Sequence, residues 1–540
     1  MEKYVIGIDY GTQSARAAVV RASDGSIMGT CAYPYPHGVM SESLPDGTKL
    51  PEQFALAEAE DYIEALEKTV IGAVAASKVA RDDIVGLCVD ATSCTVVPVD
   101  GNMLPLSLRP EYKNRPEAYI KMWKHHAAKP QTERANALAK AMDMPFMQTC
   151  GGEMSSEWMI PKLLEMREND REVYESMNCA LDLCDYLTML LTGDITRGLG
   201  SAAFKSNWVQ GIGYPSEEYL EGLAKGFAGE YLHLMRGEII RPGEKAGVLQ
   251  SSMAEKLGLP AGITVAGGIL DGHTSIPTSG LYRAGDVSLV IGTSNVSAIL
   301  TEKPMPVPAG AASAMDGFAP GLFAIDSGQS CTGDMLGWYM KYMLPAYIER
   351  EAGERGMSVY DHLNDLAEKA GPWKCPVTVM DWWNGNRNVM CNLNLKGNIQ
   401  GISLSTRPED IYTAMIQAIA CGTRKIFEDC EKKGAKIENI VACGGIPQKN
   451  PFLMQQYANI LGRTLRVACA DEGPAMGSAI FAACAAGIYE SYEEAAKHMQ
   501  VRRFIDYAPD TKHKGDYSSI YARFCKYYEL LGETDKFYFC

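Results

Sequence analysis

At 540 residues the chain exceeds the size at which one hydrophobic core stops growing, so two large domains are the simplest expectation. A net charge of −15 argues against a nucleic-acid binder, and no run approaches the ~20 apolar residues that span a bilayer. The 16 cysteines are scattered without zinc spacing, which predicts reduced thiols in a cytoplasmic protein rather than a disulfide framework.

The first predicted element is a pair of strands over residues 5–20, joined by a tight polar turn. The turn consists of four residues, Gly11, Thr12, Gln13 and Ser14. Successive backbone N–H groups in such a turn form a concavity that binds anions. Asp9 would repel a phosphate group there unless a Mg²⁺ ion bridged the two, so we interpret Asp9 as a ligand of the metal or of its water. A simple hairpin turn remains the alternative, because Asp, Gly and Ser are common in turns.

The next part of the chain predicts short strands and loops over residues 21–60 and a helix over residues 52–78. A continuous apolar run follows over residues 84–89 and ends in Asp90. This pattern is typical of a strand that is buried on both faces and whose C-terminal end lies at a crevice.

A further helix is predicted over residues 119–141. It contains His125 and His126, which would point in different directions on a helix, so a shared metal ion is disfavoured. The following helix is expected to begin near Ser155 and Ser156, with serine as its N-cap.

The layout of the opening stretch returns in the second half of the chain. An apolar strand over residues 262–270 ends in Asp271, and two strands over residues 287–300 flank a second small turn. That turn is Gly292, Thr293 and Ser294. The repetition predicts two similar domains, each with a hairpin that faces phosphate in one cleft. The second hairpin lacks a carboxylate, so we expect it to contact phosphate only.

The last part predicts a strand around Asp326, helices over residues 410–432 and 450–461, and a strand over residues 437–443. The strand leads into Gly444 and Gly445, whose bare backbone would allow a flat ring to lie on it. A helix of small residues begins near residue 473 and is expected to pack closely against a neighbour, and a terminal helix covers residues 517–531.

No Gly-x-x-x-x-Gly-Lys-Ser/Thr loop is present, which argues against a P-loop enzyme. Two hairpin phosphate loops with a glycine-rich adenosine shelf are the layout of the actin-like ATPase superfamily. The expected fold is therefore α/β, two-domain and ribonuclease H-like, with the active site in the interdomain cleft. We place the domains at residues 1–264 and 265–540.

The whole chain resembles the FGGY carbohydrate kinases, and among them the L-ribulokinases. The second family signature is matched over residues 397–402 and 410–417, whereas the first is met only in part, because Glu165 stands where the family often has Trp. Further similar runs are Val89–Thr92, Trp123–His126, Ser155–Trp158, Lys205–Trp208, Asp381–Gly385 and Gly444–Ile446.

The resemblance implies an ATP- and Mg²⁺-dependent kinase that phosphorylates the 5-hydroxyl of L-ribulose in arabinose catabolism. A homodimer is compatible with it. It implies that Asp271 is the catalytic base. The residues implied to contact the sugar are Ala91, Lys205, Asp271 and Asp326. Those implied to bind the nucleotide are Gly11, Thr12, Gln13, Ser14, Gly292, Thr293, Ser294, Gly444, Gly445 and Asn450, with Asp9 at the metal.

Several alternatives stay open at this stage. Asp271 could serve as a helix N-cap, and Lys205 could be a surface lysine. The family's ribulokinases often have Glu where Asp326 stands, and this shorter side chain leaves a kinase of D-ribulose, ribitol or L-xylulose as a rival. A catalytically silent sugar sensor is the rival of a different class. Retention of Asp9, Asp271 and both turns argues against it, because a sensor needs no base.

Overall fold

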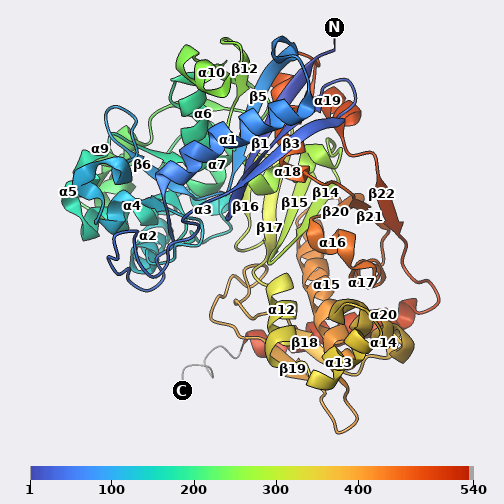
Figure 1. Cartoon of the computed structure of the whole chain (residues 1–540). Coiled ribbons are helices and arrows are strands. Elements are labelled where there is room, and N and C mark those ends of the chain that lie inside the picture. The colour runs from blue at the N-terminus through green and yellow to red at the C-terminus, as the bar shows by residue number, and fades with distance from the viewer. Residues whose placement is uncertain (1, 534–540) are drawn as a thin grey trace.

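The computed structural model describes residues 2–533 as an α/β protein with two seven-stranded sheets (Figure 1). The first sheet contains β1 (Tyr4–Tyr10), β2 (Ser14–Arg21), β3 (Ile27–Pro34), β5 (Ile84–Ala91), β11 (Lys245–Val248), β12 (Thr264–Ala266) and β13 (Ile269–Leu270). The second contains β14 (Asp286–Ile291), β15 (Asn295–Thr301), β16 (Ala312–Met315), β17 (Phe323–Gln329), β20 (Asn439–Cys443), β21 (Leu465–Ala468) and β22 (Phe504–Tyr507).

The two sheets repeat one topology. In the first, the β1–β2 hairpin is extended by antiparallel β3 on one side and by parallel β5 and β12 and antiparallel β11 on the other. In the second, the β14–β15 hairpin is extended by antiparallel β17 and, on its other side, by parallel β20 and β21 and antiparallel β22. The internal duplication predicted from the two Gly-Thr turns is therefore confirmed.

Three smaller sheets complete the strands. One has four strands in the order β4 (Leu56–Ala57), β7 (Ile120–Lys121), β6 (Val96–Val99) and β8 (Cys179–Asp182). The second pairs β9 (Thr196–Gly198) with β10 (Glu238–Ile240). The third pairs β18 (Thr378–Met380) with β19 (Asn398–Gln400).

Helices pack around both large sheets. Those before residue 280 are α1 (Ala59–Ser77), α2 (Lys129–Ala141), α3 (Phe146–Thr149), α4 (Met159–Asn169), α5 (Arg171–Ser176), α6 (Leu183–Thr192), α7 (Leu199–Lys205), α8 (Glu217–Leu223), α9 (Phe227–Leu234), α10 (Ser251–Leu257) and α11 (Ser275–Thr278). The later ones are α12 (Gly333–Tyr342), α13 (Ala346–Glu354), α14 (Val359–Ala370), α15 (Pro408–Lys432), α16 (Gly445–Lys449), α17 (Pro451–Leu461), α18 (Gly473–Ala485), α19 (Tyr492–Met499) and α20 (Lys514–Gly532).

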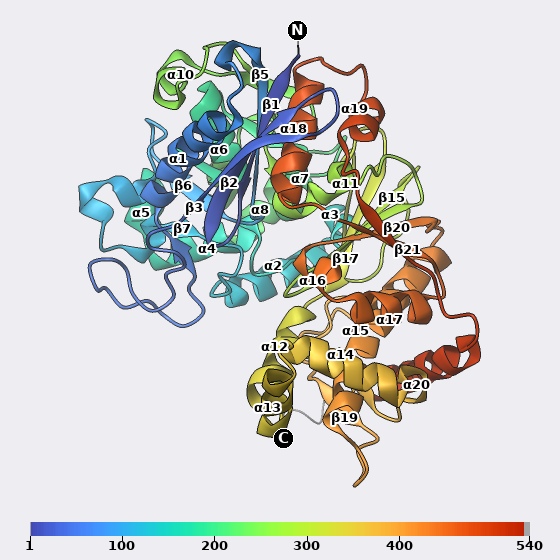
Figure 2. The same ribbon diagram turned by 45° about the vertical axis from the view of Figure 1, so that its right-hand side comes forward.

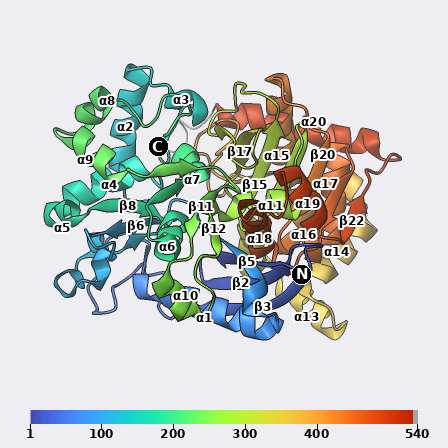
Figure 3. The same ribbon diagram turned by 90° about the horizontal axis from the view of Figure 1, so that it is seen from above.

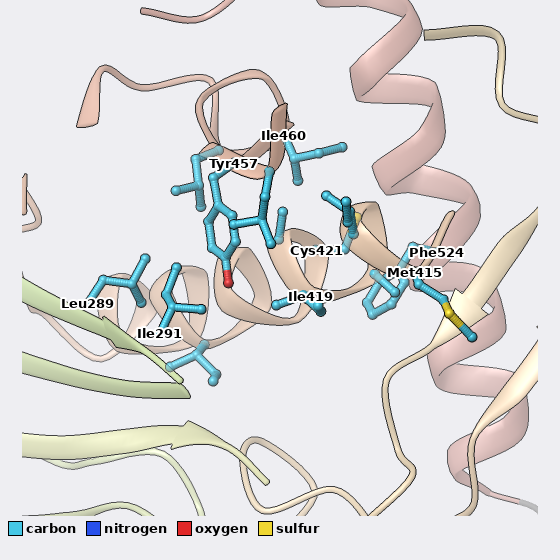
Figure 4. Close-up of a cluster of buried hydrophobic side chains, with 14 of the residues drawn as sticks. Leu289, Ile291, Met415, Ile419, Cys421, Tyr457, Ile460 and Phe524 are labelled. Carbon is cyan, nitrogen blue, oxygen red and sulfur yellow. The ribbon is translucent and has the colours of Figure 1, made fainter. Parts of the chain in front are cut away.

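A core of buried apolar side chains fixes the second sheet to its helices. Leu289 and Ile291 of β14 lie in one cluster with Ile419 of α15 and Tyr457 of α17 (Figure 4). All four are at most 1% exposed. The apolar residues that predicted a helix over 410–432 all lie in or against this cluster.

Helix α18 returns from the second half of the chain and lies against the first sheet (Figures 2 and 3). The contact is between backbones. A Cβ atom on Gly7 of β1 would lie 1.7 Å from the carbonyl oxygen of Ala475, and one on Gly477 would lie 2.2 Å from that of Thr274. The close packing predicted for the small-residue helix is confirmed, and it joins strand β1 to the segment after Asp271.

Two local predictions were wrong. Residues 120–121 form strand β7, which pairs with β4 and β6, so only Lys129–Ala141 of the predicted 119–141 helix is helical. Tertiary strand pairing outweighed local helix propensity there. Helix α4 begins at Met159, and its N-cap is Trp158 without a side-chain hydrogen bond, so the serines do not cap it.

The predicted helix over residues 52–78 begins later, at Ala59, because residues 56–57 pair with β7. The fifteen cysteines within the described part of the chain all carry free thiols, as expected. Over the same residues, none of the helices combines the length and the apolar character needed to cross a bilayer.

The α18 crossing yields a stability test. We expect Gly7→Ala to lower the free energy of unfolding by several kcal/mol, because the added Cβ has no space and the α18 backbone must move. Gly229→Ala in helix α9 is the matched control, since nothing lies within 4 Å of its Cβ position and alanine favours helix there by about 0.5–1 kcal/mol. Urea unfolding of both variants measures the difference. Equal stabilities would contradict this view of the crossing.

Candidate active site

Three carboxylates gather where parallel strands of the first sheet end. Asp9 of β1 lies opposite Asp90 of β5, and Asp90 lies opposite Ile269 of β13. Asp271 follows β13 directly. The sequence pattern indicated Asp9 and the family resemblance indicated Asp271, but neither assigned Asp90 to the site, although the carboxylate at the end of an apolar strand was its signal.

The carboxylates perturb one another. Burial, followed by the charge of Asp9, raises the pKa of Asp271 to about 7. Burial also raises the pKa of Asp9 and holds that of Asp90 well above its usual range. Like charges so close, with so little water, favour protonation.

Few partners offset this repulsion. Arg16 Nη1 lies 3.5 Å from Asp9 Oδ2, Ser478 Oγ of helix α18 donates to Asp90 Oδ2 at 2.5 Å, and the Gly272 N–H donates to Asp271 Oδ1 at 2.6 Å. The second oxygen of Asp90, Oδ1, is buried and has no hydrogen-bond partner among the residues described. Protonation of Asp90, whose pKa lies well above its usual range, therefore relieves part of the repulsion.

This donor set fits a hard divalent cation. Mg²⁺ is bound by one or two carboxylates together with water and phosphate oxygens rather than by a cage of side chains. Residues 2–533 contain no group of three or more His, Cys, Asp or Glu side chains arranged as a metal site. Asp9 and the unpartnered oxygen of Asp90 are the atoms that could face such an ion.

A second group of charges adjoins the carboxylates. Lys205, the last residue of α7, places Nζ 3.5 Å from Oδ2 of Asp326 in β17, and both residues are buried. The Lys205 charge partly offsets the raised pKa of Asp271 and lowers the pKa of Asp326. Ala91 follows Asp90 in β5 and lies opposite Leu270, so all four predicted sugar contacts lie around one region.

The first turn is closed by its own backbone. The Gly11 N–H donates to the Ser14 carbonyl at 3.1 Å, and the Gln13 carbonyl accepts from the Tyr35 N–H at 3.0 Å. The Thr12 hydroxyl accepts a hydrogen bond from Trp123 Nε1 at 3.1 Å. Trp123 therefore fixes the turn from outside, a contact that the sequence pattern did not predict.

The second turn is held in a similar way. The Gly292 N–H donates to the Ser294 carbonyl at 2.8 Å, and the Thr293 carbonyl accepts from the Thr332 N–H at 2.8 Å. A Cβ atom on Gly333 would lie 2.6 Å from the Gly292 carbonyl oxygen, so the start of α12 packs directly on the turn.

The double glycine lies beside this second turn. Gly444 has φ = 107°, and a Cβ atom there would lie 2.7 Å from the carbonyl oxygen of Ile291. A Cβ atom on Gly445 would have no neighbouring atom within 4 Å, apart from the adjacent residues of the chain. Asn450 is mostly buried and caps α17, accepting from the Leu453 N–H at 3.0 Å, so its side chain is already engaged.

The segment after Asp271 links the carboxylates to the second sheet. Ser288 Oγ of β14 donates to Ser275 Oγ at 2.9 Å, and Thr278 Oγ1 donates to the Gly473 carbonyl at the start of α18 at 2.7 Å. The segment that follows Asp271 is thus hydrogen-bonded to β14, the strand that leads into Gly292, and to the start of α18.

Comparison with known proteins identifies the family. The model of the FGGY family of carbohydrate kinases, N-terminal domain, matches residues 4–276, and that of the C-terminal domain matches residues 287–486. The chain belongs to the FGGY family of carbohydrate kinases. The first model covers the N-terminal half of this FGGY kinase, and the second covers most of its C-terminal half.

Curated relatives are similar over nearly the whole FGGY kinase chain. A ribulokinase of Anoxybacillus flavithermus is 37% identical over 99% of this chain and 95% of its own. One of Geobacillus thermodenitrificans has the same identity and coverage. The crystal structure of a xylulose kinase from Rhodospirillum rubrum has a TM-score of 0.81 at 20% identity and covers 99% of this chain and 100% of its own, which supports the two-domain fold.

The departure of this FGGY kinase from the first family signature has a local explanation. Glu165 Oε2 lies 2.8 Å from Nε2 of His125 and 3.3 Å from Nζ of Lys121. Lys121 in turn lies 2.6 Å from Glu117 Oε2. All four side chains are almost fully buried, and Glu165 shares the pairing of the buried Lys121 charge with Glu117.

The raised pKa of Asp271 predicts how its replacement changes stability. Because the native pKa is about 7, above the ordinary 3.8, ionised Asp271 destabilises the ligand-free fold, and this cost appears as pH rises from about 4 to 7. Asp271→Asn removes it. We expect the ligand-free variant to unfold at a higher temperature than wild type at pH 8, by a difference that shrinks at pH 5.

Calorimetry at both pH values measures the effect, with Asp334→Asn on α12 as the control. A difference that is the same at pH 5 and pH 8 would show that Asp271 has an ordinary pKa.

Proposed function

We propose that this chain transfers the γ-phosphoryl group of ATP to the 5-hydroxyl of L-ribulose. The observation that carries the proposal is the position of Asp271, between Asp9 on the nucleotide side and Lys205 on the sugar side. The relatives named ribulokinase support the choice of a ribulose as the acceptor.

In this proposal Asp271 accepts the proton of the 5-hydroxyl as its oxygen attacks the γ-phosphorus. A base whose pKa lies near the working pH is well matched to this task. Phosphoryl transfer has a loose transition state, so most of the catalysis comes from positioning and from stabilising charge. The Gly272 N–H bond to Asp271 Oδ1 fixes the carboxylate, which leaves its other oxygen for the hydroxyl.

Sugar binding is assigned to the second group of charges. Lys205 donates to sugar oxygens and Asp326 accepts from a hydroxyl, with the Ala91 backbone beside them. A site that pairs each hydroxyl rejects analogues that lack one. The two Gly-Thr turns would offer backbone N–H groups to the phosphates, and Gly444 and Gly445 would support the adenosine.

Mg²⁺ would be held by Asp9 and Asp90 and would neutralise charge on the β- and γ-phosphates. When bound, it would also offset the repulsion that these carboxylates exert on Asp271. The domain division at 264/265, the homodimer and the cytoplasmic location stay predictions.

The role of Asp271 is tested by Asp271→Ala. We expect kcat to fall by about 10²–10⁴-fold, the usual share of a general base, while the dissociation constant for the sugar changes only modestly. A coupled ADP-release assay and calorimetric sugar titration separate the two effects. Turnover within a few-fold of wild type would refute the assignment.

The sugar itself is tested with a panel. We expect the highest kcat/KM for L-ribulose over D-ribulose, ribitol and L-xylulose. Preference for another member would make the chain a kinase of that sugar, the alternative that Asp326 in place of Glu leaves open. Binding of ATP without turnover of any pentulose or pentitol would favour a silent sensor.

A further inference from the structure

Arg387 lies beside the carboxylate of Asp326, in a loop to which neither the sequence patterns nor the proposed mechanism gives a role. Its Nη2 is 3.9 Å from Asp326 Oδ2, the same oxygen that Lys205 Nζ approaches at 3.5 Å from the other half of the chain. The second oxygen, Asp326 Oδ1, is buried and has no hydrogen-bond partner in the described part of the chain.

Both cation distances exceed those of an ordinary hydrogen bond. N–H···O bonds in proteins span about 2.7–3.2 Å, so the Lys205 bond to Asp326 is a long one, and the Arg387 contact is an ion pair without a hydrogen bond. The Arg387 side chain is 36% exposed and carries five N–H donors in a planar fork. The cluster therefore offers unused donors next to an unused acceptor, which suits a ligand with adjacent hydroxyl groups.

The charges of the cluster keep these roles distinct. Lys205 and Arg387 lower the pKa of Asp326, so the carboxylate stays ionised and can only accept. His273, packed between Phe204 and Phe318, has its pKa lowered to about 3 by burial and is neutral. The cluster therefore offers two cationic donors and one ionised acceptor to the oxygens and hydroxyls of a ligand.

The loop that carries Arg387 is anchored on both sides. Asn388 Oδ1 accepts from the Gly328 N–H at 2.8 Å, two residues along β17 from Asp326. Asn386 Nδ2 donates to the hydroxyl of Tyr528 on helix α20 at 3.0 Å. The loop is thus fixed on both sides of Arg387, so only the arginine side chain has to be ordered when a ligand binds.

The position of Lys205 indicates which end of the sugar meets Arg387. Helix α7, which ends in Lys205, packs against β13, the strand that leads into Asp271, and Lys205 Nζ lies 3.5 Å from Asp326 Oδ2. Lys205 therefore connects the side of Asp271 to the side of Asp326. Asp271 belongs to the reacting end of the sugar. The Asp326 and Arg387 side of the cluster therefore faces the opposite end.

We propose that Arg387 is a further substrate-binding residue, which donates hydrogen bonds to hydroxyl oxygens at the end of the sugar remote from the transferred phosphoryl group, while Asp326 Oδ1 accepts from a neighbouring hydroxyl. This inference rests on the proposed kinase function and adds a specificity-determining contact to it.

The test is Arg387→Met, with Arg350→Met on the exposed face of α13 as the matched control. Loss of a charged hydrogen bond predicts a rise of about 10–100-fold in KM for L-ribulose, with kcat within a few-fold and KM for ATP unchanged. The control should match wild type. An unchanged KM for the sugar in Arg387→Met, beside an active wild type, would overturn the proposal.

Two further measurements separate hydrogen bonding from a role in merely holding Asp326. Arg387→Lys keeps the charge but loses the fork, so we expect only partial recovery of KM. With 1-deoxy- and 3-deoxypentuloses, the penalty of Arg387→Met should shrink for the analogue that lacks the contacted hydroxyl. Full recovery by lysine, or an equal penalty for every analogue, would overturn donation by Arg387.

Failure of the proposed function gives a different result. If wild type phosphorylates no sugar, the kinase proposal fails, and calorimetric titration of wild type and Arg387→Met with the same sugars still tests the contact. A sugar that binds wild type and Arg387→Met with equal affinity would overturn the Arg387 proposal alone.

Discussion

The mutual repulsion of three carboxylates is the constraint on which the rest of the site depends. Strand register places Asp9 against Asp90, and Asp271 follows the next parallel strand. The fold cannot relax this arrangement without shifting the sheet, because a one-residue slip would turn each side chain to the opposite face. In the ligand-free protein the cost is met in part by protonation, because burial raises the pKa of all three groups, and neighbouring charge adds to the rise for Asp90 and Asp271. A cation and phosphates would be expected to relieve it.

The duplicated sheets explain how one chain builds a two-sided site. Each sheet contains one hairpin with a Gly-Thr turn, β1–β2 in the first and β14–β15 in the second. Carboxylates flank the first turn, and the double glycine Gly444–Gly445 flanks the second. Helix α18 then crosses from the second half to the first, and its Ser478 bonds Asp90. The site is thus assembled from both halves, while the glycine contact at Gly7 keeps the crossing close.

Much of this could be predicted from the sequence because its signals are local. Strand, turn and strand were readable at residues 5–20 and 287–300, and the helical spacing of 410–432 was correct. What failed depends on long-range contacts. Residues 120–121 became strand β7 by pairing with β6, and Trp123 reaches Thr12 across 111 positions of sequence.

The candidate site divides in the same way. Asp9, Asp271 and the glycines of both turns stand at strand ends, a position that the pattern reveals. Asp90 was visible as a strand-end carboxylate, yet only the register against Asp9 brings it into the site. Arg387 lies in an irregular loop, and only the folded chain places it 3.9 Å from Asp326. No periodicity or turn chemistry could have shown that.

The most direct test of this account is a crystal structure of the chain with Mg²⁺, a non-hydrolysable ATP analogue and L-ribulose. The account predicts the 5-oxygen of the sugar within hydrogen-bond distance of Asp271, facing the terminal phosphate, with the metal on the side of Asp9. A 5-oxygen remote from Asp271, or a triphosphate bound away from the two Gly-Thr turns, would contradict it.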